Sequence, residues 1–305
     1  NFSVHAMERL GLGYASLSAI NPALVYASST GYGRSGPMTA YPAMDIAVQA
    51  MSGVMSINGF ADRPPVKVGP AMADFAAGTH LYAAITTALF ERGRTGLGQH
   101  VEVSMLESVY ASLASNLGLY YASQGQVSAR TGNKHGGMAE SPYNVYPTAD
   151  GGHIAIVAAS DEQWRRLLAA IGRAELIGDA RYSTLKERVA RMDEVDGIVE
   201  AFTRAHDRDR AFAILMEASI TCAPVRDIGE VVHDPHLLGR GALEWTEHPQ
   251  YGRIPLQRSP LRFGHAPQPA IEPSGEAGRD NAAVYQQWLG LGEQELASLK
   301  DEGVI

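Results

Sequence analysis

The first 125 residues alternate short apolar runs with longer helical patterns, and this alternation constrains the fold more than any other feature of the sequence. Residues 24–28 form a compact run with β-branched and aromatic members, which is typical of a strand buried on both faces. A second strand is predicted at 101–103, after a helical pattern over about 77–92. Strands that alternate with helices pack as a sheet covered by helical layers. An α/β fold is therefore predicted for this part of the chain.

Three further helices are expected in the same part. A short one spans 14–20 and ends before Asn21-Pro22, because proline disfavours helix in the residue that precedes it. Two others are predicted at 45–54 and at 105–123, and the second of them is largely apolar. The glycine-rich residues 31–37, which follow the first strand, are predicted to form a loop.

The composition shifts near Gly125, and the pattern that follows is different. A hairpin is predicted at 150–152, where Asp-Gly-Gly leads into a strand at 153–158. The helix after this strand is capped by Ser160 or Asp161. More polar helices follow, and then a strand at 223–228.

These patterns divide the chain into parts with different architectures. We predict a large α/β domain, a linker, a smaller α+β domain and a returning C-terminal segment, over residues 1–125, 126–143, 144–262 and 263–305 respectively. The last segment carries an extended proline-rich stretch at 267–274 and two short helices after 281.

The charge balance excludes several classes of partner. The 305 residues include 25 Lys and Arg against 33 Asp and Glu, so the net charge is −8. Nucleic acids and anionic membranes bind surfaces that carry an excess of Lys and Arg, and neither is expected here. No run approaches the roughly 18 apolar residues that a membrane helix needs, and no secretory leader is recognisable, so we expect a cytoplasmic protein.

Cysteine and histidine usage argues against disulfides and metals. The single cysteine, Cys222, excludes an internal disulfide framework and a multi-cysteine zinc site, and is interpreted as a small buried residue. His233 and His236 have a suggestive spacing, but Pro235 breaks the helical face between them, so a surface loop is predicted there. The sequence also lacks a phosphate loop, a Gly-x-Ser-x-Gly elbow and a His-Glu-x-x-His motif.

One carboxylate stands out from this background. Asp74 lies among small and apolar residues in the segment 69–80, where a helix is predicted to begin. Aspartate is a preferred helix N-cap, so a purely structural role would explain it. The small neighbours would also let a ligand reach the carboxylate, and an ionised aspartate is a nucleophile that needs no companion base. It would need an activated acyl partner and donors for the developing oxyanion. The residues alone leave both roles open.

Short motifs occur in order along the whole chain: Asn1-Phe2, Met7-Glu8-Arg9-Leu10-Gly11-Leu12, Asn21-Pro22, Gly31-Tyr32-Gly33, Met72-Ala73-Asp74-Phe75, Arg94-Thr95-Gly96-Leu97-Gly98-Gln99 and Pro147-Thr148-Ala149-Asp150-Gly151. Together they resemble the class III (CaiB/BaiF-type) CoA-transferases, the group of the formyl-CoA and carnitine CoA-transferases, with α-methylacyl-CoA racemases as relatives. The resemblance implies a Rossmann-like large domain and an interlocked homodimer. It also implies that the first βα units of the family's fold precede Asn1.

The resemblance places Asp74 on the family's catalytic aspartate and implies covalent catalysis. Asp74 would attack an acyl-CoA thioester, release CoA as the thiolate and form an aspartyl-acyl anhydride. The thiolate would then attack the Asp74 carbonyl to give an enzyme-CoA thioester, and an acceptor carboxylate would enter last and leave as the new acyl-CoA. The implied partners are acyl-CoA and a small carboxylic acid, with no tightly bound cofactor and no metal.

CoA is an anion, so an acidic protein must hold it with local donors. Arg9 is the family-matched candidate, although a solvated surface arginine would explain it as well. The resemblance also implies that the CoA cleft is lined by Asn1, Phe2, Ser3, Pro42, Ala43, Met44 and Asp45. Packing alone would explain the apolar members of this set. Gly136 and Gly137 lie where some transferases carry a mobile glycine-rich lid, but an ordinary turn fits this short version equally well.

One departure from the family bears on the reaction. Racemase relatives place a histidine immediately before the residue that matches Asp45, because racemisation needs two bases on opposite faces of the α-carbon. Met44 occupies that position here and cannot transfer protons. We therefore predict an acyl-CoA:carboxylate CoA-transferase, with an α-methylacyl-CoA racemase and a non-catalytic CoA-binding protein as alternatives. Short dicarboxylates such as succinate are the expected acids, because they are common in the family.

Overall fold

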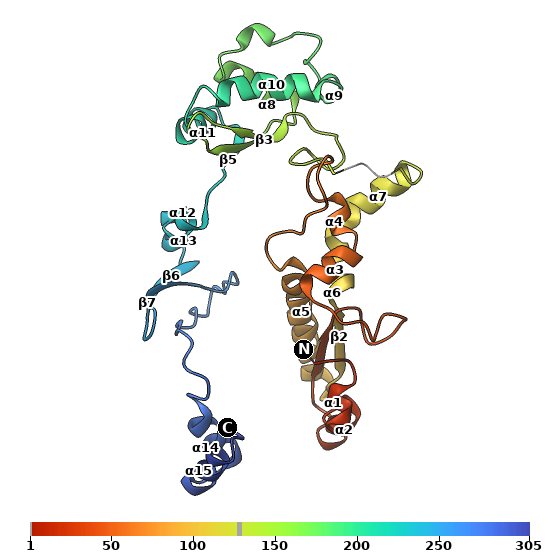
Figure 1. Cartoon of the computed structure of the whole chain (residues 1–305), viewed down its shortest axis with the longest axis vertical. Coiled ribbons are helices and arrows are strands. Elements are labelled where there is room, and N and C mark those ends of the chain that lie inside the picture. The colour runs from red at the N-terminus through yellow and green to blue at the C-terminus, as the bar shows by residue number, and fades with distance from the viewer. Residues whose placement is uncertain (1, 127–129) are drawn as a thin grey trace. The chain divides into compact units, whose positions relative to one another are not determined.

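The structure, a computed structural model, describes residues 2–126 and 130–305. The chain divides into two compact units, Asn1–Val225 and Arg226–Ile305 (Figure 1). The domain boundaries predicted after residues 125, 143 and 262 stay predictions. Within the described residues, no helix combines the length and the apolar character needed to cross a membrane.

The first unit contains a parallel pair of strands, so the mixed α/β architecture is confirmed. Strand β1 (Tyr26–Thr30) pairs with β2 (His100–Ser104), in register from Tyr26 with His100 to Thr30 with Ser104. Strand β1 begins at Tyr26 rather than at residue 24, because its pairing with β2 starts only at Tyr26 and His100. The Tyr26 N–H donates to the Gln99 carbonyl at 2.9 Å.

The helices of this part are α1 (Ala6–Arg9), α2 (Tyr14–Ile20), α3 (Asp45–Met51), α4 (Val54–Ile57), α5 (Met72–Thr95), α6 (Met105–Tyr110) and α7 (Ala114–Ala122), with a 3-10 turn at Ala111–Leu113. Helix α2 has the predicted bounds. Helix α5 begins at Met72, whereas the sequence predicted a start near residue 77. The single helix predicted over 105–123 is interrupted by the 3-10 turn, where the Ser112 hydroxyl donates to the Val109 carbonyl at 2.7 Å.

A small apolar core lies among these helices. Its buried members are Val48, Val54, Ala73, Val109 and Leu113. Ala73 has no exposed surface, so the first turn of α5 is packed against α3 and α6 on one side. The start of α5 is therefore fixed from within the core.

A second sheet follows in the same unit. Strands β3 (Tyr143–Pro147), β4 (His153–Val157) and β5 (Thr221–Pro224) pair antiparallel in the order β3-β4-β5, with the predicted turn between the first two. The helices that cover it are α8 (Asp161–Ala170), α9 (Leu185–Val189), α10 (Met192–Thr203) and α11 (Arg208–Glu217) (Figure 1). Sheet and helices share a larger apolar core built around Ile154, Trp164 and Val199. Ser160 caps α8 through a capping box with Gln163.

A fully buried arginine, Arg188, binds backbone carbonyls beside this sheet. The Arg188 guanidinium donates to the carbonyls of Ser141, Ala159 and Tyr182, at 2.9, 3.0 and 3.1 Å. It also pairs with Asp161 at 2.9 Å. Burial lowers the pKa of Arg188, while the bond to Asp161 raises it. Because several acceptors surround the charge, it is tolerated in a buried position.

The second unit holds α12 (Ile228–Val232), α13 (Pro235–Gly239), the antiparallel hairpin of β6 (Leu243–His248) and β7 (Gly252–Gln257), α14 (Asn281–Leu289) and α15 (Glu293–Asp301). The last two are the short helices predicted after residue 281. The surface loop predicted at 233–236 is wrong in its second half. Pro235 begins α13, and the Asp234 carboxylate caps that helix by accepting the N–H groups of His236 and Leu237. Proline suits the first helical position because no N–H is needed there.

We predict that Gly98→Ala destabilises the first unit. A Cβ at Gly98 would lie 2.0 Å from the Leu24 carbonyl oxygen, so the backbone would have to move. The Gly98 N–H also donates to the Pro22 carbonyl at 2.9 Å. This hydrogen bond links the residues that precede β2 to those that precede β1. Overpacking of this kind costs about 1–3 kcal/mol, which urea unfolding followed by circular dichroism would measure.

Gly93→Ala is the matched control. Gly93 lies within α5, and a Cβ there would meet nothing within 4 Å. Alanine favours a helix over glycine by up to about 1 kcal/mol, so this variant should be as stable as the native chain or more so. Equal unfolding midpoints for the two variants would contradict the proposed backbone clash.

Candidate active site

A cavity opens at the ends of the two parallel strands. Its volume is about 880 Å³, and its wall includes Ser29 and Thr30 at the end of β1, the turn 31–33 and Met105, directly after β2. Ligands of α/β proteins bind outside the carboxyl ends of parallel strands, because the loops there are free to form a site. The topology therefore favours this cavity as the functional site of the first unit.

Close backbone contact builds one wall of this cavity. A Cβ at Gly31 would lie 2.1 Å from the Cβ of Ala43, so only glycine allows the end of β1 to approach the segment 40–43. Tyr32 and Tyr41 meet edge to face across this contact, with ring centroids 6.1 Å apart. Both tyrosines line the cavity. The sequence had shown the Gly31-Tyr32-Gly33 motif but not its place in the site.

The cavity brings together most of the residues that the sequence singled out. Its lining includes Phe2, Ser3, Arg9, Pro42, Ala43 and Asp74. Asn1 lies outside the described residues. Met44 and Asp45 do not line the cavity, and neither do Gly136 and Gly137. The cavity is also lined by four residues that the sequence did not single out as site residues: Thr30, Tyr32, Tyr41 and His5. The turn predicted after the first buried strand was the signal available for this part of the wall.

Asp74 lies in the first turn of α5. Ala71 is the N-cap of this helix, so the structural role considered for Asp74, that of N-cap, is wrong. The Asp74 side chain is exposed, and no described residue donates a hydrogen bond to it or pairs with it. Ala73, the preceding residue, is buried in the core, whereas Asp74 lines the cavity together with Ala77, one helical turn further on. The partial positive charge of a helix N-terminus favours a carboxylate here.

The Asp45 carboxylate holds the same turn in place. Its Oδ1 accepts the N–H of Ala73 at 2.8 Å, and its Oδ2 accepts from the Gln49 amide at 2.6 Å. Ala71 has no side-chain acceptor to cap α5, so Asp45 supplies the missing acceptor from another helix. This contact explains why α5 starts at Met72, earlier than the pattern predicted.

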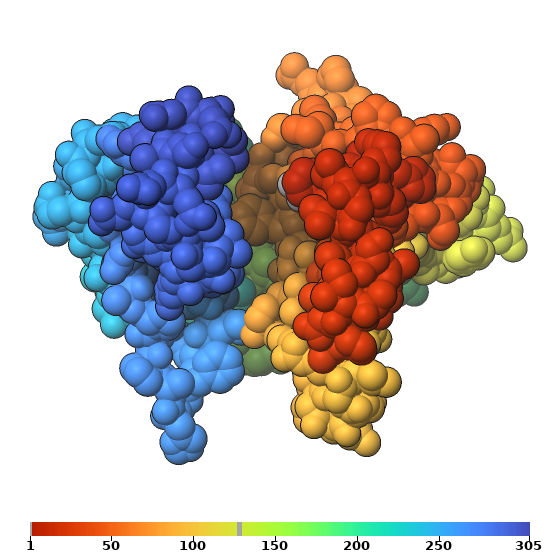
Figure 2. All heavy atoms as spheres, turned by 90° about the horizontal axis from the view of Figure 1, so that it is seen from below, coloured from red at the N-terminus to blue at the C-terminus, as the bar shows by residue number. Residues whose placement is uncertain are grey.

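The two arginines near the cavity have different partners. Arg34 donates to the Val4 carbonyl at 3.0 Å and pairs with Glu8, whose pKa it lowers through that hydrogen bond. These bonds fasten the N-terminal residues to the turn after β1, and the space-filling view shows the red N-terminal residues lying against the orange residues that follow (Figure 2). Arg9 lines the cavity and makes no ion pair with any described residue. Its charge is therefore available to an anion.

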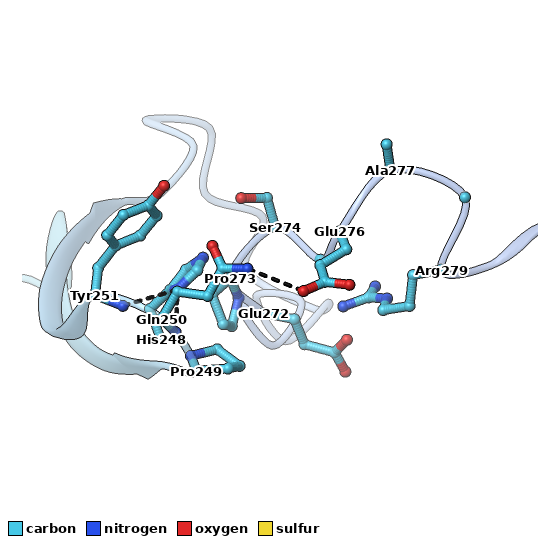
Figure 3. A pocket seen from close by; sticks show the side chains of 12 residues that line it. His248, Pro249, Gln250, Tyr251, Glu272, Pro273, Ser274, Glu276, Ala277 and Arg279 are labelled. Atoms are coloured by element: carbon cyan, nitrogen blue, oxygen red, sulfur yellow. Dashed lines mark hydrogen bonds between the residues drawn. The ribbon is translucent and has the colours of Figure 1, made fainter.

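The second unit has a cavity of similar size, about 850 Å³, between the β6–β7 turn and residues 272–279. Its polar groups bind one another (Figure 3). The His248 Nδ1 accepts the N–H groups of Gln250 and Tyr251, at 3.1 and 3.3 Å, and the Gln250 amide donates to Glu276 at 3.0 Å. These bonds shape the turn and hold it to residues 272–279.

Cys222, the other candidate nucleophile, lies elsewhere. It lies on β5 opposite Ile156 and packs against the core of the second sheet. Burial raises the pKa of its thiol to about 11, so it is protonated near neutral pH and a poor nucleophile. Among the described residues, no cluster of His, Cys, Asp and Glu could hold a metal ion.

An α/β protein with an exposed carboxylate and an unpaired arginine around one cavity is suited to binding an anionic substrate and attacking it. The model of CoA-transferase family III matches residues 1–281, and the chain belongs to this family, as the sequence predicted. Its relatives and solved neighbours agree with that assignment.

Two relatives and two solved structures illustrate the likeness. The chain is 32% identical to the succinyl-CoA–D-citramalate CoA-transferase of Chloroflexus aurantiacus, over 100% of this chain and 75% of that protein. It is 34% identical to the succinate–glutarate CoA-transferase of Agrobacterium fabrum, over 94% and 71%. The structure of a CAIB/BAIF family protein from Brucella suis matches with a TM-score of 0.82 and 32% identity, over 94% and 74%. A structure from M. tuberculosis matches with a TM-score of 0.79 and 25% identity, over 92% and 74%. The chain is thus an acyl-CoA:carboxylate CoA-transferase.

Proposed function

We propose that Asp74 is the nucleophile that carries CoA from an acyl-CoA thioester to a free carboxylic acid. The observation that supports this role is an exposed carboxylate on the cavity wall, held in the first turn of α5 and bound by no described residue. A carboxylate is ionised near neutral pH and needs no neighbouring base to act as a nucleophile.

In the first half of the reaction, an Asp74 oxygen attacks the thioester carbonyl. The C–S bond breaks, CoA leaves as the thiolate, and an aspartyl-acyl anhydride forms. The thiolate sulfur then attacks the Asp74 carbonyl carbon, which breaks the anhydride and releases the donor acid as its carboxylate. Asp74 is left as a CoA thioester.

The second half runs the same steps in reverse with the acceptor. The acceptor carboxylate attacks the Asp74 thioester, and the thiolate leaves as a new anhydride forms. The thiolate attacks the acceptor's carbonyl, which frees Asp74 and yields the new acyl-CoA. One thioester replaces another, so the exchange is nearly isoenergetic and needs no ATP. We propose short dicarboxylates as the acids, because the relatives named above act on succinate, glutarate and D-citramalate or their CoA esters.

Asp74→Asn should abolish the exchange. The amide is not nucleophilic, and loss of a covalent nucleophile lowers kcat on the order of 10³-fold or more. Incubation of the native protein with succinyl-CoA should leave a hydroxylamine-sensitive adduct on Asp74, detected by mass spectrometry of the peptide. The variant should show no adduct. Full activity of Asp74→Asn, with no adduct on the native protein, would contradict the proposal.

Two further assays separate the alternative functions. Solvent deuterium at the α-carbon of a 2-methylacyl-CoA, without any acceptor acid, would favour a racemase. Binding of CoA in calorimetry that is unaffected by Asp74→Ala, with no exchange for any acid in a panel of donors and acceptors, would favour a non-catalytic CoA-binding protein. Neither result is expected.

We propose that Arg9 contributes to binding of the CoA anion, with Phe2, Ser3, Pro42 and Ala43 as neighbouring walls of the cavity. Arg9→Gln should raise the KM for acyl-CoA by about 10- to 100-fold with kcat nearly unchanged, because a hydrogen bond to a charged group contributes about 1.5–3 kcal/mol. Steady-state kinetics at fixed ionic strength would measure this.

Arg94→Gln is the matched control for Arg9→Gln. Arg94 is exposed in the last turn of α5 and pairs only weakly, at 3.8 Å, with Glu91. Its substitution removes the same charge at a site away from the cavity lining. Equal KM increases in both variants would assign the effect to net charge rather than to Arg9.

We further propose that the chain forms an interlocked homodimer. Phe75, Tyr82 and Leu89 recur every seven residues along α5 and are 67, 51 and 39% exposed. Residues at this spacing lie on one helix face, and an exposed apolar face supports a covering partner. Light scattering should give a mass of twice 32.6 kDa. Tagged and untagged dimers should form no hybrid when mixed without denaturant, since threaded chains separate only on unfolding; rapid hybrid formation, or a monomer mass, would contradict it.

The remaining finer expectations stay predictions. They are the Rossmann-like arrangement of the large domain, the contacts of Met44 and Asp45 with CoA, the lid at Gly136 and Gly137, and the cytoplasmic location.

A further inference from the structure

We propose that Gln49 is a positioning residue, which acts through Asp45 to set the place of the Asp74 carboxylate. The inference rests on the proposed role of Asp74. It concerns a buried side chain on α3 that neither lines the cavity nor bears a charge.

The Gln49 side chain joins two segments that lead to the nucleophile. It is fully buried. Its Oε1 accepts the N–H of Val68 at 2.8 Å, and its Nε2 donates to the Asp45 carboxylate at 2.6 Å and more weakly to the Val68 carbonyl at 3.5 Å. The amide thus binds the backbone just before α5 and the side chain that caps α5.

Asp45 passes this constraint to the reacting group. One carboxylate oxygen is held by Gln49, and the other accepts the N–H of Ala73, the residue before Asp74. Because Gln49 binds one oxygen of the Asp45 carboxylate, this group has little freedom to rotate. Its other oxygen therefore holds the Ala73 N–H in one position. Ala73 is also packed in the apolar core with Val48 and Val109. Together these contacts fix the first turn of α5.

The arrangement matters because Asp74 itself has no described partner that would orient it. Its position follows only from the backbone turn that carries it. A misplacement of about 1 Å at a reacting atom can reduce the rate about 10²-fold. A side chain that fixes this turn therefore affects kcat, although it never touches the substrate.

Single substitutions should break the network by mismatching donors and acceptors. Gln49→Glu places two carboxylates next to each other. In Asp45→Asn, the new amide oxygen accepts the Ala73 N–H, so its NH₂ group faces the NH₂ group of Gln49 and two donors meet. Each should lower kcat on the order of 10- to 100-fold. For Gln49→Glu the KM for acyl-CoA should change less than threefold, because Gln49 does not line the cavity and Arg9 and Phe2 are not affected.

The double variant, Asp45→Asn with Gln49→Glu, should restore the network. The amide introduced at position 45 can still accept the Ala73 N–H with its oxygen. Its NH₂ group can donate to the carboxylate introduced at position 49, whose second oxygen accepts the Val68 N–H. The double variant should therefore recover most of the lost kcat. Because the charge has moved to a fully buried position, stability should recover less than activity. Such non-additivity is the signature of a direct interaction between the two side chains.

Ser52→Ala is the control for a purely structural effect. Ser52 is buried at the end of the same helix, and its hydroxyl donates only to the Gln49 carbonyl, at 3.1 Å. This variant should lower the unfolding midpoint and leave kcat unchanged. Each rate is measured at a temperature where circular dichroism shows the variant folded, together with the single-turnover rate of adduct formation on Asp74.

The outcomes are distinguishable from a failure of the proposed function. If Asp74→Asn is inactive while Gln49→Glu and Asp45→Asn keep the native kcat, the positioning role is overturned and the nucleophile stands. If Ser52→Ala lowers kcat as much as Gln49→Glu, or the double variant recovers nothing, the positioning role is also overturned. If Asp74→Asn is fully active, the proposed function itself fails.

Discussion

The hydrogen bond from the Ala73 N–H to the Asp45 carboxylate is the contact on which the site depends. Ala71 stands at the N-cap of α5 and has no side chain that could satisfy the first turn. The acceptor therefore comes from α3, at a separation of 28 residues. This bond, with the buried methyl group of Ala73, fixes the first turn of α5 against the core, and Asp74 follows it on the wall of the cavity.

Small residues shape the rest of the cavity in the same way. Gly31 lets the end of β1 touch Ala43, and the contact brings the segment that precedes Asp45 up to the strand ends. The parallel pair of β1 and β2 then places Thr30 and Met105 at one edge, where the cavity opens. The wall, the cap and Asp74 thus come from three segments that close contacts bring together.

Sequence signals predicted those elements whose causes are local. Pro22 ends α2 at the predicted residue, and Ser160 with Gln163 caps α8 at the predicted place. The start of α5 was missed because its cap is Asp45, which no local pattern links to Met72. The β6–β7 hairpin was not foreseen either, since each of its strands is defined chiefly by the other.

Within the site, the resemblance supplied Asp74 and Arg9, and the cavity lining includes both. The sequence did not show the hydrogen bonds of Asp45, because its carboxylate is bound by a backbone N–H and by Gln49, a residue with no recognisable motif. The role of a buried amide such as Gln49 depends on which donors and acceptors face it in the folded protein. The order of residues along the chain does not show these contacts.

The proposed role of Asp74 makes positioning the main task of the residues around it. Cys222, the one thiol, has its pKa raised to about 11 by burial and would need a base to become reactive. A carboxylate needs none, so the neighbours of Asp74 need not activate it and none of the described ones bonds to it. On this mechanism the protein must chiefly supply position: a helix turn held by Asp45 and Gln49, an arginine that pairs with no described residue, and a cavity of about 880 Å³ whose lining includes Asp74. An acidic chain can bind an anion under these conditions because the local arrangement of charge, with Glu8 already occupied by Arg34, outweighs the net charge at short range.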